Sequence, residues 1–265
     1  MPFSSLKAKL RFTVDNRLSH SLMNLAAVCI DNTFYRKYEV TNKKDAEFLL
    51  AKRSADSAEG WLLDAEGPLL YSLALNCKGR GAVVEIGSWK GKSTIYLGKG
   101  SKAGHSVTIY AVDPHTGGYE HKLFGGRATF EEFSSNIINA GVADIITPIV
   151  ATSEEAANNF ARPCELIFID GSHEYTLVRI DFELWFPKLV DGGIIAFHDT
   201  LGWEGPRKVV TEFLFKSMNF KNIGFVQSIV FGEKVGQNSR IDRLRNRCVL
   251  FLHKLRALIW NVAAV

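Results

Sequence analysis

A glycine-containing loop between an expected strand and an expected helix is the part of the sequence best suited to holding a ligand. The apolar run at 82–86 carries Glu85 near its end and is followed by Gly87, Gly91 and a stretch of helical period. Glycine lacks a Cβ, so these two positions let the backbone approach a ligand closely. The Glu85 carboxylate is suited to a cationic amino group. The loop therefore predicts a small-molecule site at the end of this strand.

Two common nucleotide-binding loops compete with this interpretation. A dinucleotide loop requires G-x-G-x-x-G, and only Gly87 and Gly91 are present. A Walker A loop requires four residues before Gly-Lys-Ser/Thr, whereas three residues separate Gly87 from Gly91-Lys92-Ser93. The missing residue removes a backbone N–H from the phosphate cradle. Because Leu166–Asp170 is typical of a Walker B strand, a P-loop-like NTPase remains an alternative, as does a module that binds a nucleoside without turnover.

Polar residues follow three further apolar runs of the sequence. Asp113 ends the second run, where its carboxylate can accept both hydroxyls of a ribose. Asp170 follows the fourth run, and His198-Asp199 follow the fifth. Because ligands of open parallel sheets bind at the carboxyl edge of the strands, we expect these side chains to lie together beside the pocket. A ligand with an amino-acid end and a nucleoside end fits this pattern.

The elements that must position these residues alternate along the chain. Short runs rich in Val, Ile and Phe alternate with stretches of helical period between 82 and 231, which is typical of a parallel sheet covered on both faces. Strands are expected at 82–86, 107–112, 145–150, 165–169 and 193–197, with a further pair in 222–233. Helices are expected at 92–100, 127–140, 153–160, 174–189 and 205–217. A glycine-rich insertion from His115 to Arg127 is typical of a mobile lid.

Four segments carry a resemblance to a known family: Glu85–Thr94, Asp113–His115, Phe168–Tyr175 and Gly192–Asp199. In this order they resemble the successive motifs of class I S-adenosylmethionine-dependent methyltransferases, and within these the catechol-type and macrocin-type O-methyltransferases. The resemblance covers approximately Trp61 to Lys234. It implies an α/β fold with a doubly wound, mostly parallel, Rossmann-like sheet, and methyl transfer to a hydroxyl of a small molecule or sugar.

The resemblance also assigns site residues. The first loop would hold the methionine end of S-adenosylmethionine and Asp113 its ribose, while Ser153 would lie near the adenine and Asp170 beside the cofactor. The loop residues assigned in this way are Glu85, Gly87, Ser88, Trp89, Gly91 and Ser93.

In the resembling enzymes, acidic residues after the fourth and fifth strands bind a divalent metal. Asp170 and Asp199 match this pattern, whereas His198 stands where Asp or Glu is more usual. Oxygen ligands suit Mg²⁺ or Mn²⁺, and an imidazole shifts the preference toward later transition metals. His173 can accept the proton, with Asp170 as its catalytic neighbour and His115 as a weaker rival. The alternative is that His173 only caps or braces the Asp170 loop. The alternative for Asp170, His198 and Asp199 is a hydrogen-bonded polar cluster without a metal.

The composition of the sequence indicates which classes of partner and which cellular compartment are expected. The 265 residues are 46% hydrophobic and 23% charged, with a net charge of +4, as in an ordinary soluble globular protein. From Ser239 onward the sequence contains six cations and one acid, Asp242, so the basic charge is concentrated in the C-terminal stretch. In nucleic-acid-binding domains the cations are more often spread over the folded domain. The four scattered cysteines and the lack of a long uninterrupted apolar run favour a cytoplasmic protein that binds no nucleic acid.

The sequence divides into three regions: a helical N-terminal extension at 1–60, the cofactor-binding domain at 61–235, and a basic amphipathic helix at 236–265. Leucines between Leu6 and Leu25 recur at helical spacing among cations. In the last region one apolar arc is expected, with Arg247, Lys254 and Arg256 near its edges; it comprises Cys248, Phe251, Leu252, Leu255, Leu258, Ile259 and Val262. We expect such faces to pack against the core or a second subunit, giving a homo-oligomer, or to contact a membrane surface.

Overall fold

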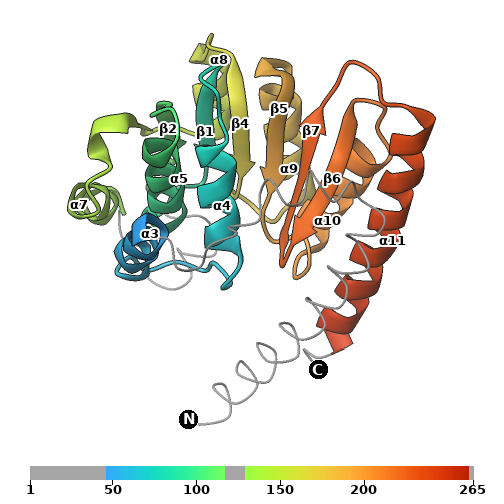
Figure 1. Ribbon diagram of the computed structural model, residues 1–265, viewed down its shortest axis with the longest axis horizontal. Helices are drawn as coiled ribbons and strands as arrows, with labels where there is room; N and C mark the ends of the chain where they lie inside the picture. Colours follow the sequence, from blue (N-terminus) through green and yellow to red (C-terminus); the bar gives the residue numbers. More distant parts are fainter. Residues whose placement is uncertain (1–45, 117–128, 263–265) are drawn as a thin grey trace.

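The computed structural model describes residues 46–116 and 129–262 (Figure 1). The amphipathic region at 6–25 and most of the expected lid lie outside these residues. Within the described ranges, no helix combines the length and the apolar character needed to cross a bilayer.

A seven-stranded sheet forms the centre of the fold, in the order β3-β2-β1-β4-β5-β7-β6. Strands β1 to β5 are parallel, whereas β7 runs antiparallel to both β5 and β6. Chain order reverses direction between β1 and β4, so the carboxyl ends of these strands flank the crevice where open α/β sheets bind ligands. The strands are β1 (Ala82–Ile86), β2 (Ile109–Val112), β3 (Ile146–Ile149), β4 (Cys164–Ile169), β5 (Leu189–Phe197), β6 (Phe220–Val226) and β7 (Ile229–Lys234).

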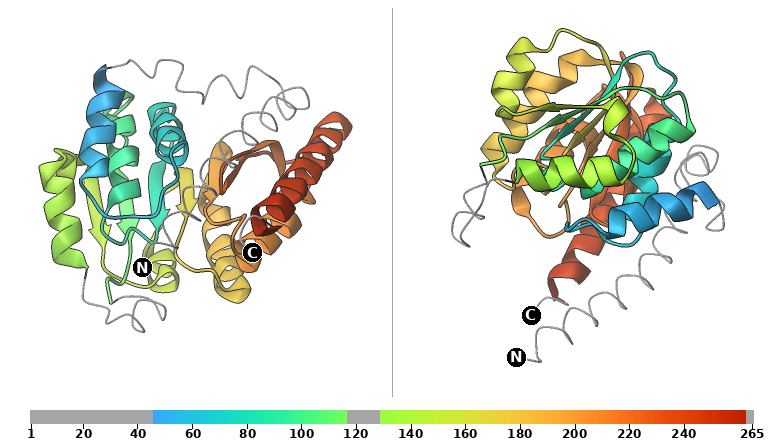
Figure 2. Two further views of the ribbon diagram at one scale, coloured as in Figure 1. Left: turned by 90° about the horizontal axis from the view of Figure 1, so that it is seen from below. Right: turned by 90° about the vertical axis from the view of Figure 1, so that its left-hand side faces the viewer.

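Helices cover both faces of this sheet, as Figure 2 shows from two directions. One apolar core contains residues of α3 (Ala46–Asp56), α4 (Glu66–Leu75), α5 (Lys92–Ala103) and α7 (Phe130–Asn139). The other core contains residues of α8 (Ser153–Asn159), α9 (Tyr175–Trp185), α10 (Glu204–Val209) and α11 (Arg240–Val262). Alternate residues of β4 serve the two cores: Leu166 and Phe168 face the first, Ile167 and Ile169 the second.

The expected fold class is confirmed: the sheet is doubly wound, mostly parallel and Rossmann-like. The expected strands agree with the observed ones to within two residues, except that β5 begins at Leu189, four residues before the expected start. The expected helix at 205–217 is α10 followed by a π-helical segment at Val210–Phe215. Helix α3 packs on α5 with Phe48, Ala51 and Ala55 buried, so it shares the core of the domain. The division of the chain at residues 60 and 235 stays a prediction.

The expected C-terminal helix is present, but much of its expected apolar arc is exposed and does not pack against the domain. Helix α11 lies beside β6 (Figure 1), and Leu252 and Arg256 are buried while Phe251 and Leu258 are exposed. The buried face includes polar side chains that hydropathy alone places outside: Asn246 donates to the carbonyl of Phe220.

Candidate functional site

The first loop is built around two glycines with left-handed backbones. Gly87 has φ +89° and Gly91, at the start of α5, has φ +88°. A Cβ added at Gly87 would lie 2.4 Å from the carbonyl oxygen of Asp170, and one at Gly91 would lie 3.1 Å from Phe133. Only glycine fits both the conformation and the space at Gly87. The first loop and the end of β4 are therefore in direct contact.

Polar groups at this loop have unused hydrogen-bonding capacity. Glu85 is fully buried at the end of β1, and its Oε2 accepts a hydrogen bond from the Thr94 hydroxyl. Its Oε1 and the buried hydroxyl of Ser88 make no hydrogen bond to the described residues. Burial raises the pKa of Glu85 to about 8. A buried acid of this kind is suited to an ammonium group, which would restore its charge. Ser93 lies close by, buried in the first turn of α5.

Asp113 joins the loops that follow β1 and β2. Its Oδ2 accepts the backbone N–H of Trp89 at 2.8 Å, and its Oδ1 accepts that of His115 at 2.6 Å. Trp89 has φ +41° and stacks on Trp61, with ring centroids 4.3 Å apart. Each carboxylate oxygen has a second lone pair, so Asp113 can hold the loops and still accept ribose hydroxyls.

Ser153 occupies the first turn of α8, directly after β3. Its hydroxyl accepts a hydrogen bond from the Trp185 indole N–H at 3.0 Å. Thr152 caps the helix in a capping box with Glu155, which fixes the position of Ser153. The proximity of Ser153 to an adenine remains a prediction.

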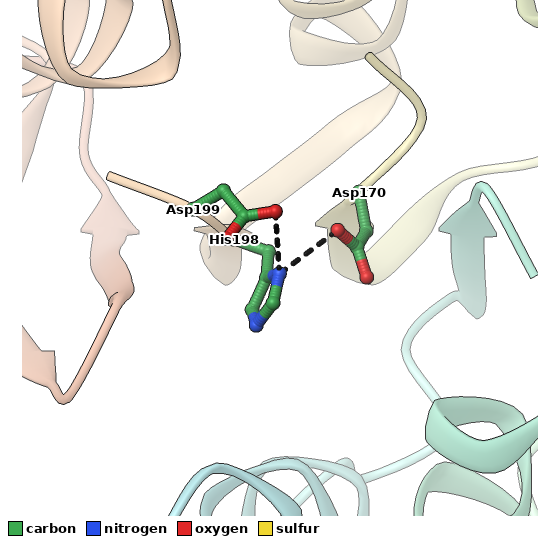
Figure 3. Close-up of side chains that lie close together, drawn as sticks. All are labelled: Asp170, His198 and Asp199. Carbon is green, nitrogen blue, oxygen red and sulfur yellow. Dashed lines mark ion pairs between the residues drawn. The ribbon is translucent and has the colours of Figure 1, made fainter. Parts of the chain in front are cut away.

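Asp170, His198 and Asp199 meet at the carboxyl edge of the sheet (Figure 3). His198 Nδ1 lies 3.0 Å from Asp170 Oδ1 and 3.2 Å from Asp199 Oδ2. The parallel pairing of Ile169 with Phe197 brings the ends of β4 and β5 level, and this register explains the meeting. One ligand atom from each of the three residues lies within 4.8 Å of the others, as a metal site requires.

Glu66 is a fourth member of this cluster that the sequence did not indicate. It lies in the first turn of α4, fully buried, with Oε2 3.0 Å from His198 Nε2. Its Oε1 accepts the backbone N–H of Ser228 at 2.8 Å and the Ser228 hydroxyl at 2.6 Å, while Oε2 also accepts the N–H of Leu63 at 2.7 Å. Glu66 therefore ties α4, the β6–β7 turn and His198 together.

The three carboxylates control the charge of His198. Burial by itself lowers the pKa of His198, but Asp170 and Glu66 outweigh it and raise the pKa well above its usual value. Burial raises the pKa of Asp170, and His198 opposes that rise. For Asp199, burial is outweighed by its contacts with His173 and His198, which bring its pKa below the usual range. Three carboxylates around one imidazole form a site suited to a cation.

His173 lies against this cluster and is oriented by two neighbours. Its Nε2 is 2.9 Å from Asp199 Oδ2, and its ring stacks on Trp203 at 4.2 Å between centroids and 9° between planes. Asp199 has φ +58°, a backbone that non-glycine residues seldom adopt. His115, the rival base, is buried with Nδ1 2.9 Å from Thr129 Oγ1, and burial lowers its pKa.

Comparisons with known proteins agree with this architecture. Residues 84–200 match the family described as a methyltransferase domain. The uncharacterized protein y4gI of Sinorhizobium fredii is 31% identical over 120 residues, which are 44% of this chain and 13% of that protein. This chain thus spans about an eighth of the length of that relative.

Two solved O-methyltransferases share the fold. TomG of Streptomyces achromogenes, solved with S-adenosylmethionine and involved in tomaymycin synthesis, is 15% identical with a TM-score of 0.52, covering 76% of this chain and 95% of its own. NovP is 16% identical with a TM-score of 0.55, covering 82% of this chain and 99% of its own. The family match favours methyl transfer over the P-loop alternative. Residues 84–200 are thus similar to a methyltransferase domain, and the chain shares the fold of the two solved O-methyltransferases.

Proposed function

We propose that this protein transfers the methyl group of S-adenosylmethionine to a hydroxyl of a small molecule, with a saccharide as the favoured acceptor class. The observation that carries the proposal is the contact of Gly87 with the carbonyl of Asp170. It sets the cofactor loop beside the Asp170, His198, Asp199 and His173 cluster. Methyl transfer needs an acceptor aligned with the sulfonium and an oxygen freed of its proton, and adjoining sites serve both needs.

The first loop and the residues near it would bind the cofactor. Glu85 would meet the ammonium of the methionine end, because its buried Oε1 makes no hydrogen bond of good geometry to the described residues. Ser88, Trp89, Ser93 and the backbone between Gly87 and Gly91 would surround the same end. Asp113 would accept the ribose hydroxyls, Ser153 would lie near the adenine, and Asp170 would border the transferred methyl.

His173 is proposed as the general base. Asp199 accepts a hydrogen bond from the Nε2–H group and so holds the ring with Nδ1 as the basic nitrogen. Stacking on Trp203 fixes the plane of the ring. Asp170, beside the cofactor loop, would orient the acceptor hydroxyl toward this nitrogen. The partly exposed Trp203 offers an apolar face to a sugar or an aromatic ring, which supports the acceptor class.

A divalent metal fits the residues present. His198 Nδ1 faces two carboxylate oxygens without making a hydrogen bond of good geometry, whereas its Nε2 is bonded to Glu66. Metal-bound histidines usually donate their other N–H to a carboxylate in this way. Asp170, His198 and Asp199 would be the ligands. Such an ion would lower the pKa of the acceptor hydroxyl. Mg²⁺ or Mn²⁺ suits the oxygens, and the imidazole favours Mn²⁺ of these two.

A methyl-transfer assay tests this proposal. The chain, loaded with Mn²⁺, is incubated with methyl-labelled S-adenosylmethionine and a panel of glycosides and phenols, and labelled products are identified by mass. We expect a gain of one methyl on an oxygen of at least one acceptor. Label appearing only on nitrogen or carbon acceptors, with none on oxygen, would contradict the proposal.

Two expectations about the cellular setting stay proposals. Among the described residues, Cys164 and Cys248 are free thiols, which supports the cytoplasmic location. Homo-oligomer formation also stays a prediction, and the charge pattern of α11 described below argues against that helix as the subunit interface.

A further inference from the structure

Helix α11 carries an exposed apolar stripe along its full length. Ile241, Leu244, Phe251 and Leu258 are between 63% and 68% exposed, and Leu255 is 38% exposed. Their spacing of three, four or seven residues places them on one side of the helix. The opposite side, with Val249, Leu252 and Ala257, is buried against the domain. The described residues leave this stripe uncovered.

A row of cations runs parallel to the stripe. Arg240, Arg247 and Lys254 recur every seven residues and are all exposed, so they line one flank of the apolar side chains. The single acid of α11, Asp242, accepts the N–H and the hydroxyl of Ser239 at the start of the helix. Beyond that first turn the helix carries cations and no carboxylate.

We propose that this face of α11 docks on an anionic lipid bilayer. An apolar stripe flanked by cations is the pattern of helices that lie in the membrane interface, where apolar side chains enter the acyl boundary and cations meet anionic headgroups. A second copy of the chain fits less well. Two such faces packed together would bring rows of like charge close to each other, and α11 has no carboxylate past Asp242 to pair with them.

The buried side of α11 connects this face to the proposed methyl-transfer site. Asn246 bonds to the carbonyl of Phe220 at the start of β6, whereas His253 Nε2 lies 3.1 Å from the hydroxyl of Thr200, the residue after Asp199. The helix thus runs from the amino edge of the sheet to its carboxyl edge. Leu258 therefore lies at the end of the molecule where the site is found, so docking would hold that site near the bilayer.

Vesicle co-sedimentation of the full chain tests the proposal. Vesicles of phosphatidylcholine alone are compared with vesicles that also contain phosphatidylserine, at low and high salt. We expect binding to the anionic vesicles that falls as salt rises. The triple variant Leu244→Gln, Phe251→Gln, Leu258→Gln should bind at least about tenfold more weakly, because it removes the inserted apolar surface. The variant Arg247→Gln, Lys254→Gln should lose about 30-fold at low salt, since each cation near such a surface contributes about 1 kcal/mol.

A matched control variant distinguishes binding through α11 from non-specific binding through other exposed apolar side chains. Ile138→Gln, Leu177→Gln removes two apolar side chains, 64% and 51% exposed, from α7 and α9 and should bind as the unmodified chain does. Equal binding to neutral and anionic vesicles, or unchanged binding of the triple variant, would overturn the proposal. The proposal would also be overturned if light scattering showed that the triple variant changes from dimer to monomer while its vesicle binding stays the same. Calorimetry with S-adenosylmethionine on each variant reports the proposed function separately, because none of these side chains belongs to that site.

Discussion

Glu66 and His198 are 132 positions apart in sequence, yet Glu66 Oε2 lies 3.0 Å from His198 Nε2 in the buried base of the site. This contact fixes which nitrogen of the imidazole faces Asp170 and Asp199. A residue outside all of the recognised motifs thus sets the orientation of the proposed metal ligand.

Replacing Glu66 by glutamine should weaken metal binding. The amide removes the carboxylate that holds the His198 Nε2 proton, and loss of such a partner typically lowers metal affinity about 10- to 100-fold. Calorimetric titration with Mn²⁺ measures the change. Glu165→Gln is the matched control, because Glu165 is also buried and accepts backbone N–H groups from Lys78 and Arg80 away from the site. Equal Mn²⁺ affinity in both variants would show that Glu66 does not support a metal.

Glu85→Gln should stabilise the cofactor-free protein at neutral pH. Burial raises the folded-state pKa of Glu85 to about 8 from 4.5, so the folded state favours the protonated acid and loses stability as pH rises between these values. At pH 7 this amounts to roughly 3 kcal/mol. Urea unfolding from pH 5 to 8 should show a smaller decline in the variant. A decline as steep as in the unmodified chain would place the titrating group elsewhere.

The same substitution should weaken cofactor binding. Glutamine cannot form an ion pair with the cofactor ammonium, and a hydrogen bond to a charged group contributes about 1.5–3 kcal/mol. If Glu85→Gln raises the free energy of unfolding and also lowers the affinity for S-adenosylmethionine, then Glu85 serves function at the expense of stability.

Gly87→Ala and Gly79→Ala separate backbone strain from close approach. Both glycines have positive φ, but a Cβ at Gly79 meets nothing within 4 Å, whereas one at Gly87 meets the Asp170 carbonyl at 2.4 Å. Gly79→Ala should cost about 1–2 kcal/mol of unfolding free energy and leave cofactor binding unchanged. Gly87→Ala should cost more and abolish cofactor binding. Equal effects of the two variants on unfolding and calorimetry would contradict the proposed contact between the loop and β4.

His173→Ala should reduce turnover with an acceptor found in the methyl-transfer screen. Loss of a general base lowers kcat by about 10²–10⁴-fold, and the rise of rate with pH should flatten. Cofactor affinity should stay within the error of calorimetry. His105→Ala, which changes an exposed histidine after α5, is the control. A pH profile of unaltered shape in His173→Ala would assign the proton transfer to another group.

The sequence predicted what depends on local pattern. Asp170, His198 and Asp199 follow buried strands, and strand order alone brings such residues to one edge. Glu66 could not be found in this way, because its contact with His198 depends on how α4 packs over the sheet. On α11, hydropathy assigned Arg256 to the surface, although its guanidinium lies over the Phe225 ring at 5.7 Å and is buried. Such contacts, which offset the cost of burying a charged side chain, form between distant parts of the chain. They therefore leave no periodic pattern in the sequence.

The most direct test of the account is a calorimetric comparison of S-adenosylmethionine and ATP on the full chain, repeated with Asp113→Ala. We propose that Asp113 accepts the ribose hydroxyls, next to a loop that is one residue too short for a phosphate cradle. We predict that S-adenosylmethionine binds, that ATP does not, and that Asp113→Ala weakens binding by about 1.5–3 kcal/mol. Binding of ATP without any heat from S-adenosylmethionine would contradict the account.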